Sequence, residues 1–205
     1  MYSWTLWILV SYTLICTCVT GTCPYSCRCY KTSTCNGTKV NCRWGLLTRV
    51  PTGFPNDTCY IDLGWNRITT MGNGTFLGLT SLQTLDMGWN GITTMGNGTF
   101  LGLTSLQTLD LQGNGITTIG NGPFVGLTSL QTLDLRWNGI TTMGNGTFLG
   151  LTSLQTLDLY ENAITTVENG AFIGLTSLQT LQVYFIMEIR THQWSIQYAL
   201  KDLIE

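Results

Sequence analysis

Cysteine and histidine are the residues of this 205-residue chain whose chemistry depends most on spacing. Six of its eight cysteines fall between Cys23 and Cys59, close enough in sequence to pair as disulfides or to hold zinc. The one histidine is His192, and no pattern of serine and aspartate indicates a catalytic triad around it, so an ordinary surface histidine is favoured. We expect no catalytic residue, no cofactor and no metal site.

The glycine-rich segment GNGTFLG, which recurs along the chain, is the next candidate for chemistry. Its glycine spacing differs from that of a phosphate-binding loop, and its regular recurrence is typical of a structural element. The net charge is −2 with nine Lys and Arg residues, so composition gives no cationic patch for nucleic acid. We therefore expect a binding protein that is not an enzyme and has no nucleic-acid partner.

A period of 24 residues organises the middle of the chain. Leucine, asparagine and phenylalanine recur together at Leu85, Leu109, Leu133, Leu157 and Leu181, at Asn66, Asn90, Asn114, Asn138 and Asn162, and at Phe76, Phe100, Phe124, Phe148 and Phe172. Numbered from Leu82, each copy has apolar residues at positions 1, 4, 6, 11, 14, 19 and 22. These are too sparse for one copy to bury alone, so stacked copies must bury them jointly, which predicts a solenoid.

The alternation of Leu85, Asp86 and Met87 predicts a short strand with both apolar side chains inward and the aspartate outward. Each such strand should add to a parallel sheet. Asn90 should turn its amide inward, where it satisfies backbone groups of neighbouring coils. The alternative, a hairpin turn at Asn90-Gly91, does not explain why leucine, asparagine and phenylalanine recur together.

The spacing L-x-x-L-x-L-x-x-N-x-I resembles the 24-residue leucine-rich repeat of extracellular proteins. The pattern C-P-x-x-C-x-C from Cys23, followed by V-x-C at Val40 and Cys42, resembles their N-terminal cap. Together the cap, the period and the variable positions described below resemble the variable lymphocyte receptors and their relatives, although no cysteine follows Cys59, whereas those receptors end in a cysteine-containing cap. The resemblance implies an α/β-type solenoid, a horseshoe with a short-stranded parallel sheet on the concave face and a mostly irregular convex side.

We expect four segments: a signal peptide at 1–21, a cysteine-rich cap at 22–57, five repeats at 58–177, and a degenerate last repeat with a helical cap at 178–205. The first segment is uncharged and apolar but short for a membrane span, and a short membrane anchor is the alternative. In the last segment, apolar residues at helical spacing predict an amphipathic helix from about Gln193. The competing account is that this spacing is accidental.

The resemblance to the cap implies two disulfides, Cys23 with Cys29 and Cys27 with Cys42. Cys35 and Cys59 lie outside that pattern; we predict a further bridge between them, and two free thiols are the alternative. Disulfides are favoured over zinc because an exported chain folds in an oxidising compartment. In such a chain the five N-x-T triplets predict surface glycans, at Asn36, Asn56, Asn73, Asn97 and Asn145.

Two positions just past each strand vary while the rest of the repeat stays uniform. Position 7 reads Gly64, Gly88, Gln112, Arg136 and Tyr160, and position 8 reads Trp65, Trp89, Gly113, Trp137 and Glu161. The second and fourth copies differ at only two of 24 positions, one of which is position 7. Diversity on the open face of a uniform scaffold indicates a recognition surface. Drift at unconstrained positions is the alternative, and for the tryptophans stacking on one another is a second interpretation, compatible with the first.

We predict a ligand-binding set on the concave face, made of Trp65, Trp89, Gln112, Arg136, Trp137, Tyr160 and Glu161. A row of aspartates at position 5 (Asp62, Asp86, Asp110, Asp134 and Asp158) would attract a basic partner or a cation, although aspartate is also the usual residue there in this class. The sequence thus predicts a secreted, extracellular recognition module for a protein or carbohydrate ligand, with no membrane span in the mature chain. Immune recognition is the leading hypothesis, and a matrix or adhesion protein is the alternative.

Overall fold

The computed structural model describes residues 23–120, 122–185 and 193–195. Within these ranges the chain forms strands and turns and no helix. The strands are β1 (Arg28–Thr32), β2 (Gly37–Asn41), β3 (Thr58–Asp62), β4 (Thr84–Asp86), β5 (Thr108–Asp110), β6 (Thr118–Ile119), β7 (Thr132–Asp134), β8 (Thr142–Met143), β9 (Thr156–Ile164), β10 (Thr166–Val167), β11 (Thr180–Phe185) and β12 (Gln193–Ser195).

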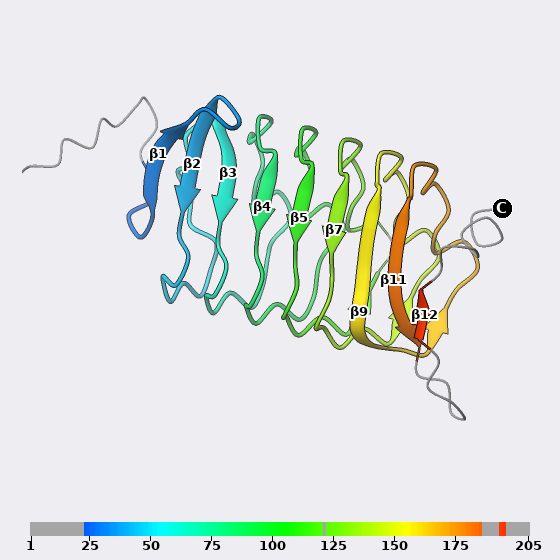
Figure 1. The fold of residues 1–205 in the computed structure, drawn as a ribbon. Helices are drawn as coiled ribbons and strands as arrows, with labels where there is room; N and C mark the ends of the chain where they lie inside the picture. Colours follow the sequence, from blue (N-terminus) through cyan, green and yellow to red (C-terminus); the bar gives the residue numbers. More distant parts are fainter. Residues whose placement is uncertain (1–22, 121, 186–192, 196–205) are drawn as a thin grey trace, which may run out of the picture.

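One long sheet runs through the whole described molecule, in the order β1-β2-β3-β4-β5-β7-β9-β11-β12 (Figure 1). From β2 to β11 neighbouring strands are parallel, and between repeats Leu85 pairs with Leu109 and Leu109 with Leu133, which keeps the 24-residue register. Loops and a small parallel sheet, β10-β8-β6, form the other side. The predicted solenoid, with its strands on one face and a mostly irregular opposite side, is confirmed; that opposite side carries turns and short strands where an α/β solenoid would carry helices.

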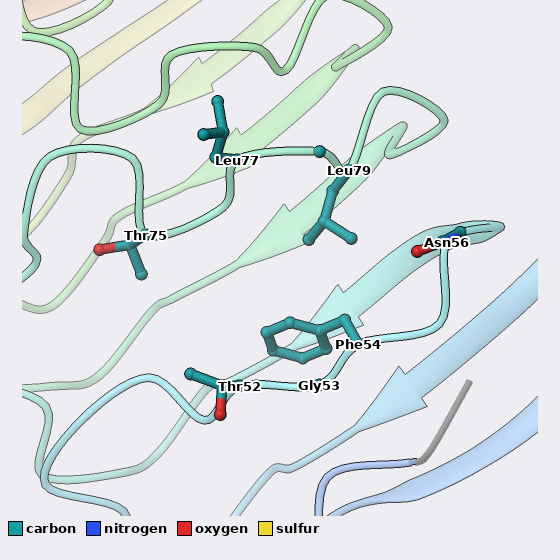
Figure 2. A pocket seen from close by; sticks show the side chains of 8 residues that line it. Thr52, Gly53, Phe54, Asn56, Thr75, Leu77 and Leu79 are labelled. Carbon is teal, nitrogen blue, oxygen red and sulfur yellow. The ribbon is translucent and has the colours of Figure 1, made fainter.

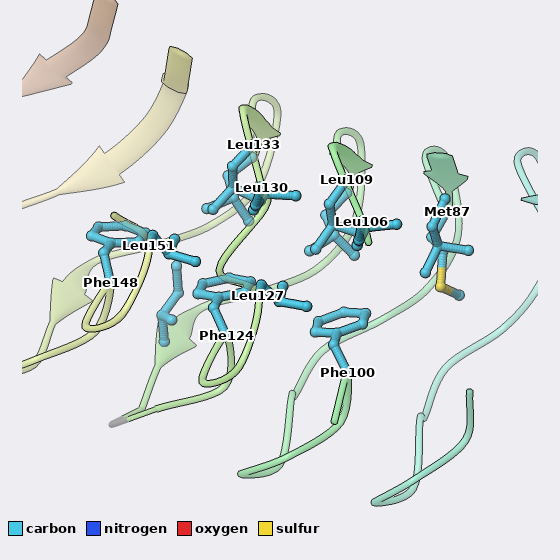
Figure 3. Close-up of a cluster of buried hydrophobic side chains, with 14 of the residues drawn as sticks. Met87, Phe100, Leu106, Leu109, Phe124, Leu127, Leu130, Leu133, Phe148 and Leu151 are labelled. Atoms are coloured by element: carbon cyan, nitrogen blue, oxygen red, sulfur yellow. The ribbon is translucent and has the colours of Figure 1, made fainter. Parts of the chain in front are cut away.

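The core lies between these two sides and continues from coil to coil. The leucines at positions 1, 4 and 22 of the repeat and the isoleucine at position 11 are buried, and phenylalanines from successive coils stack with centroids 5.7 to 6.3 Å apart. Figure 3 shows Phe100, Phe124 and Phe148 following one another beneath the leucines of the strands. Each coil therefore buries its apolar residues against its neighbours, as the period requires.

The asparagine at position 9 of each repeat binds the coils together through its side-chain amide. Asn114 donates from Nδ2 to the carbonyls of Leu111 in its own coil (2.9 Å) and Met87 in the preceding coil (3.1 Å). Its Oδ1 accepts from the backbone N–H of Ile92, also in the preceding coil, at 3.0 Å. The same bonds recur at Asn90, Asn138 and Asn162. The predicted role of this asparagine is confirmed: it pairs backbone groups that would otherwise be buried without a partner.

The cap begins the sheet with a hairpin of β1 and β2, and β2 then pairs in parallel with β3. The structure joins the three cysteine pairs expected from the sequence, Cys23–Cys29, Cys27–Cys42 and Cys35–Cys59. The third bridge ties the cap to the first repeat strand. Val40 and Cys42 are buried against the first coil, so the cap covers the end of the core that would otherwise face water.

The other end of the sheet continues beyond the fifth repeat. β11 pairs in parallel with β9, and β12 pairs with β11 in the antiparallel direction. The expectation of a helix starting near Gln193 is wrong at that point, because residues 193–195 are extended and bonded to the sheet edge, which offers unpaired backbone groups. The rest of that expected helix, 196–205, lies outside the described residues, as does the expected signal peptide.

Candidate functional site on the sheet face

Positions 7 and 8 of each coil follow the strand and form one continuous row on the sheet face. At position 8 the backbone is left-handed in every coil, with φ of 54° to 64° at Trp65, Trp89, Gly113, Trp137 and Glu161. Its N–H donates to the position 7 carbonyl of the next coil, for example from Trp89 to Gln112 at 2.8 Å. This conformation is unfavourable for bulky residues and persists because the coil-to-coil bonds impose it.

The aspartate beside this row has a structural task in every coil. Oδ1 of Asp86 accepts the backbone N–H of Gly88 at 2.9 Å, and Oδ1 of Asp134 accepts that of Arg136 at 3.0 Å. Equivalent bonds occur at Asp62, Asp110 and Asp158. Each aspartate therefore closes its strand with a local turn, which is a sufficient reason for its recurrence in the repeat.

Arg43 of the cap neutralises the N-terminal end of the aspartate row. Its Nη1 lies 3.3 Å from Oδ1 of Asp62 and 3.0 Å from Oδ2 of Asp86. A Cβ on Gly64, at position 7 of the first coil, would stand 2.9 Å from that nitrogen, so a side chain there would require the guanidinium to shift. Glycine at this position thus makes room for the guanidinium of the cap.

Arg136 neutralises the C-terminal end in the same way. Its Nη2 lies 2.6 Å from Oδ2 of Asp134, and its Nε lies 3.4 Å from Oδ2 of Asp158 in the next coil. Between the two arginines stands Asp110, whose Oδ2 accepts from Nε2 of Gln112 at 2.8 Å. Burial raises the pKa of Asp110, and the charges of the neighbouring aspartates raise it further.

The described residues hold no group of three or more histidines, cysteines or acids positioned to bind a metal ion. The aspartate row is therefore an electrostatic feature with two arginine counterions of its own. Among its members, Asp110 is bonded by a neutral amide, and Asp62, Asp86, Asp134 and Asp158 each lie within 3.4 Å of a guanidinium nitrogen.

The tryptophans of the N-terminal half stack on one another along the sheet. Trp44 lies over Trp65 with centroids 4.5 Å apart and an interplanar angle of 24°, and Trp65 lies over Trp89 at 5.0 Å and 18°. Trp65 is therefore covered on both ring faces and is the least exposed of the three, whereas Trp44 at the end of the stack is 62% exposed. The proposed stacking role of these tryptophans is thus realised in this half of the row.

Gly113 interrupts the tryptophan row. Trp89 leans over it, since a Cβ on Gly113 would stand 2.7 Å from Cδ2 of that indole. Beyond the interruption Trp137 is 51% exposed, and no described aromatic ring stacks on it. Tyr160 and Glu161 follow in the fifth coil and are also exposed. The structure therefore brings the predicted ligand-binding residues into one row, but divides them into a stacked half and an open half.

Two residues of this face, Arg43 and Trp44, were missed by the sequence prediction. They belong to the cap, whose strand joins the sheet with an offset of 21 residues (Val40 pairs with Ile61), so the 24-residue period does not reveal them. The triplet Cys42-Arg43-Trp44 nevertheless matches Leu135-Arg136-Trp137 at positions 6 to 8. This local match is a signal that would have placed both residues on the sheet face.

A cavity of about 250 Å³ lies at the junction of the cap and the first repeat, lined by Phe54, Asn56, Leu77, Leu79 and neighbouring residues (Figure 2). It contains none of the residues of the sheet-face row. Asn56, one of its lining residues, is a predicted glycan acceptor, and a glycan there would stand at the cavity.

The five predicted glycan acceptors are exposed asparagines. Three of them, Asn73, Asn97 and Asn145, share position 16 of the repeat, in the loops opposite the strands. Beside them runs a row of exposed aliphatic side chains at position 20, made of Leu77, Leu101, Val125, Leu149 and Ile173. The sheet face carries no predicted acceptor at positions 7 and 8 and would stay free of sugar.

The fold and the repeated asparagine and leucine ladders define a leucine-rich-repeat solenoid. Family models described as leucine rich repeat match residues 78–96, 90–140 and 130–184. The chain belongs to the leucine-rich-repeat proteins.

Curated relatives share part of this region. The chain is 36% identical over 81 residues to immunoglobulin superfamily member 10 of Mus musculus, over 38% of this chain and 3% of that protein. It is 38% identical over 65 residues to asporin of Bos taurus, over 32% of this chain and 16% of that protein. With matrix-remodeling-associated protein 5 of Homo sapiens the identity is 36% over 63 residues, over 31% of this chain and 2% of that protein. The chain thus matches only a small part of the length of these relatives.

Among solved structures, the complex of TLR13 with the single-stranded RNA ssRNA13 resembles this fold, with a TM-score of 0.67 and 27% identity. The similarity covers 83% of this chain and 25% of that chain. No helix among the described residues is long and apolar enough to cross a membrane. The chain resembles leucine-rich-repeat receptors in its fold and in its disulfide-bonded N-terminal region.

Proposed function

We propose that this chain is an extracellular, non-enzymatic recognition module that binds a protein ligand on its sheet face. The observation that carries the proposal is the contrast within the repeat. Asparagine and phenylalanine recur without change inside and the strand positions stay almost uniformly leucine, whereas positions 7 and 8 change from coil to coil on the sheet face. Large exposed residues such as Trp137 and Tyr160 are of the kind that dominates binding energy at interfaces.

The three disulfides of the cap support an oxidising, extracellular location. The matches to asporin and to matrix-remodeling-associated protein 5 favour a matrix or adhesion role as the second candidate function. Immune recognition rests on the resemblance of cap, period and variable face to the variable lymphocyte receptors. Both roles use the same face and differ in the ligand.

Nucleic acid is disfavoured as the ligand of this face, although TLR13 is seen with single-stranded RNA. Five aspartates and Glu161 line the row, against two arginines that are already paired. A polyanion would be repelled by the unpaired excess of carboxylates. Carbohydrate is disfavoured at Trp65, because both faces of that ring, on which a sugar ring would stack, are covered by Trp44 and Trp89.

The test is a binding screen of the secreted chain against arrays of cell-surface proteins, matrix proteins and glycans, followed by variants. Trp137→Ala with Tyr160→Ala should weaken the ligand found by about 2 kcal/mol or more, roughly 30-fold, while folding is retained. The matched control is Leu101→Ala with Leu149→Ala, which removes two apolar side chains, each 52% exposed, from the opposite side. Equal affinity of both double variants for the ligand would contradict the proposal, and the identity of the ligand separates matrix from immune roles.

A further inference from the structure

Asparagine is followed by glycine at two different places in the coil. After the strand, positions 9 and 10 read Asn90-Gly91, Asn114-Gly115 and Asn138-Gly139, and on the opposite side positions 16 and 17 read Asn73-Gly74, Asn97-Gly98, Asn145-Gly146 and Asn169-Gly170. In such a pair the backbone nitrogen of the glycine can attack Cγ of the asparagine, because glycine has no Cβ to hinder the approach. The contacts of the asparagine amide and of the glycine N–H decide whether this attack takes place.

Both groups are held in the pairs that follow the strand. Oδ1 of Asn114 accepts the N–H of Ile92 at 3.0 Å, and its Nδ2 donates to the carbonyl of Leu111 at 2.9 Å. The N–H of Gly115 donates to the carbonyl of Ile92 at 2.9 Å, and the glycines at 91 and 139 make the same bond to their preceding coils. An attack here requires the coils to separate first.

The pairs on the opposite side differ in what the glycine N–H contacts. Gly74 donates to the carbonyl of Gly98 at 3.4 Å, and Gly146 donates to that of Gly170 at 3.2 Å. The N–H groups of Gly98 and Gly170 themselves have no hydrogen-bond partner among the described residues. The asparagines that precede these two glycines are exposed. Two pairs, at 97–98 and 169–170, therefore combine an exposed amide with a free attacking nitrogen.

The glycosylation triplet separates these two pairs. Asn97 begins N-G-T and is a predicted glycan acceptor, whereas Asn169 is followed by Gly170 and Ala171 and is not. A sugar attached to Nδ2 prevents that nitrogen from leaving as ammonia. Asn121, whose triplet is interrupted by Pro123, lies outside the described residues. Among the described pairs, the one at 169–170 is thus both reactive and without a predicted sugar.

We propose that Asn169, which lacks the glycosylation triplet of its counterparts, is a site of spontaneous deamidation in the folded chain. The backbone nitrogen of Gly170 loses its proton and forms a bond to Cγ of Asn169, the bond from Cγ to Nδ2 breaks, and Nδ2 leaves as ammonia. Water then opens the resulting cyclic imide. Cleavage between the nitrogen and Cγ gives aspartate, and cleavage between the nitrogen and the main-chain carbonyl carbon gives isoaspartate. The reaction is independent of the proposed ligand binding.

The surroundings of this site make isoaspartate disruptive. The carbonyl of Gly170 accepts the N–H of Gly146 and that of Ile173, both at 3.2 Å. Isoaspartate lengthens the main chain by a methylene group directly before this carbonyl. It also adds a negative charge next to Glu168, whose Oε2 already accepts the N–H of Asn145 at 2.9 Å. Deamidation should therefore weaken the loop that joins the fourth and fifth coils.

Ageing of the secreted chain tests the reaction directly. The protein is kept at neutral pH in heavy-oxygen water, which labels every carboxylate formed during the incubation, and is mapped by mass spectrometry that separates isoaspartate from aspartate. Asn169 should react on the order of 100-fold faster than Asn90, Asn114 and Asn138, because several hydrogen bonds must open at those sites first. Equal rates at Asn169 and Asn114 would overturn the inference.

The matched variant is Ala171→Thr, which gives Asn169 the triplet of its counterparts. The coil can accommodate the change, since Thr147 at the same position of the fourth coil is fully buried and donates from Oγ1 to the carbonyl of Gly144 at 2.8 Å. Secreted with its sugar, the variant should form no isoaspartate at 169. Produced without glycans in the bacterial periplasm, it should react at the wild-type rate, and protection of that sugar-free form would contradict the role given to the missing triplet.

The effect on the coil is measured by thermal unfolding before and after ageing. The melting temperature of the wild type should fall as isoaspartate accumulates. Asn169→Gln should keep its melting temperature, because the longer side chain closes a ring with the Gly170 nitrogen far more slowly. An unchanged melting temperature of the modified wild type would overturn the predicted weakening of the loop.

Discussion

The two halves of the sheet-face row are built from the same repeat positions but differ in what their side chains contact. In the N-terminal half, Trp44, Trp65 and Trp89 cover each other's ring faces. In the C-terminal half, Trp137 has no described ring stacked on it. The same residue type at the same position therefore contributes to packing in one half and remains available for a ligand in the other.

The difference arises from the neighbours in the adjacent coils. A coil spacing of about 4.8 Å brings any two successive indoles into contact, so an isolated tryptophan needs a neighbour without an aromatic ring. Gly113 provides this on one side of Trp137 and Glu161 on the other. Exposure of a tryptophan on this face is thus decided by the sequence of the coils beside it.

The largest expected effect comes from removing the middle ring of the stack. Trp65→Ala loses two stacking contacts and should lower the free energy of unfolding by about 2 to 3 kcal/mol. Trp137→Ala, which has no stacked ring to lose, should lower it by less than about 1 kcal/mol. Equilibrium unfolding in urea measures both values. Similar losses in the two variants would show that the halves are not energetically distinct.

The effects of replacing the two arginines on the free energy of unfolding should differ less from each other than those of replacing the two tryptophans. Arg43→Gln and Arg136→Gln each remove a guanidinium that bridges two aspartates, and each should cost about 1 kcal/mol because the pairs are partly exposed. The cost should shrink at about 1 M salt, where charges are screened within about 3 Å. Unfolding at low and high salt tests this. A loss that is independent of salt would indicate packing of the arginine stem as the cause.

Replacing Asp110, which lies between the two halves, should have a smaller effect on the free energy of unfolding, and of opposite sign. Because burial raises the pKa of Asp110 in the folded chain, ionised Asp110 opposes folding at neutral pH, and this opposition fades as pH falls through its folded pKa toward the usual value of 3.8. Asp110→Asn should therefore stabilise the chain at about pH 7 and lose this advantage near pH 4.

Thermal unfolding of wild type and variant across this range measures the effect. Asp134→Asn is the control, since it loses a carboxylate held by Arg136 at 2.6 Å and should be destabilised at neutral pH. Stabilisation of both variants at neutral pH would mean that the guanidinium pairing of Asp134 contributes nothing.

The smallest effect concerns the predicted glycan acceptors on the opposite side of the solenoid. Asn73 and Asn97 occupy adjacent coils, about 5 Å apart along the stack, so two full glycans would crowd each other. Asn145 stands two coils beyond Asn97. We expect incomplete joint occupancy at the first two sites and full occupancy at the third. Mass spectrometry of intact glycopeptides that finds both of the first pair filled in every molecule would refute this.

Sequence alone could predict what the period encodes: the parallel sheet, the inward asparagine and the core positions, because each requires the same residue in every coil. It could not predict the contacts of Arg43 and Trp44, which enter the face from outside the period. Nor could it predict that the tryptophans of the row are stacked in one half and unstacked in the other, because the exposure of Trp137 depends on the spacing between coils and on Gly113. The helix expected near Gln193 was wrong because periodicity ignores an open sheet edge, to which β12 bonds.

The left-handed backbone at position 8 has a consequence for redesign. Residues as different as Gly113, Trp137 and Glu161 share nearly the same φ at this position. At Gly113 and Trp137 the backbone N–H is held by a hydrogen bond to the next coil, whatever the side chain. A combinatorial library at this position would therefore present every side chain from nearly the same backbone conformation. Proline and the β-branched residues Val, Ile and Thr would be disfavoured there, because they rarely adopt a positive φ. The side chains on the sheet face can therefore be changed one coil at a time without altering the backbone that carries them.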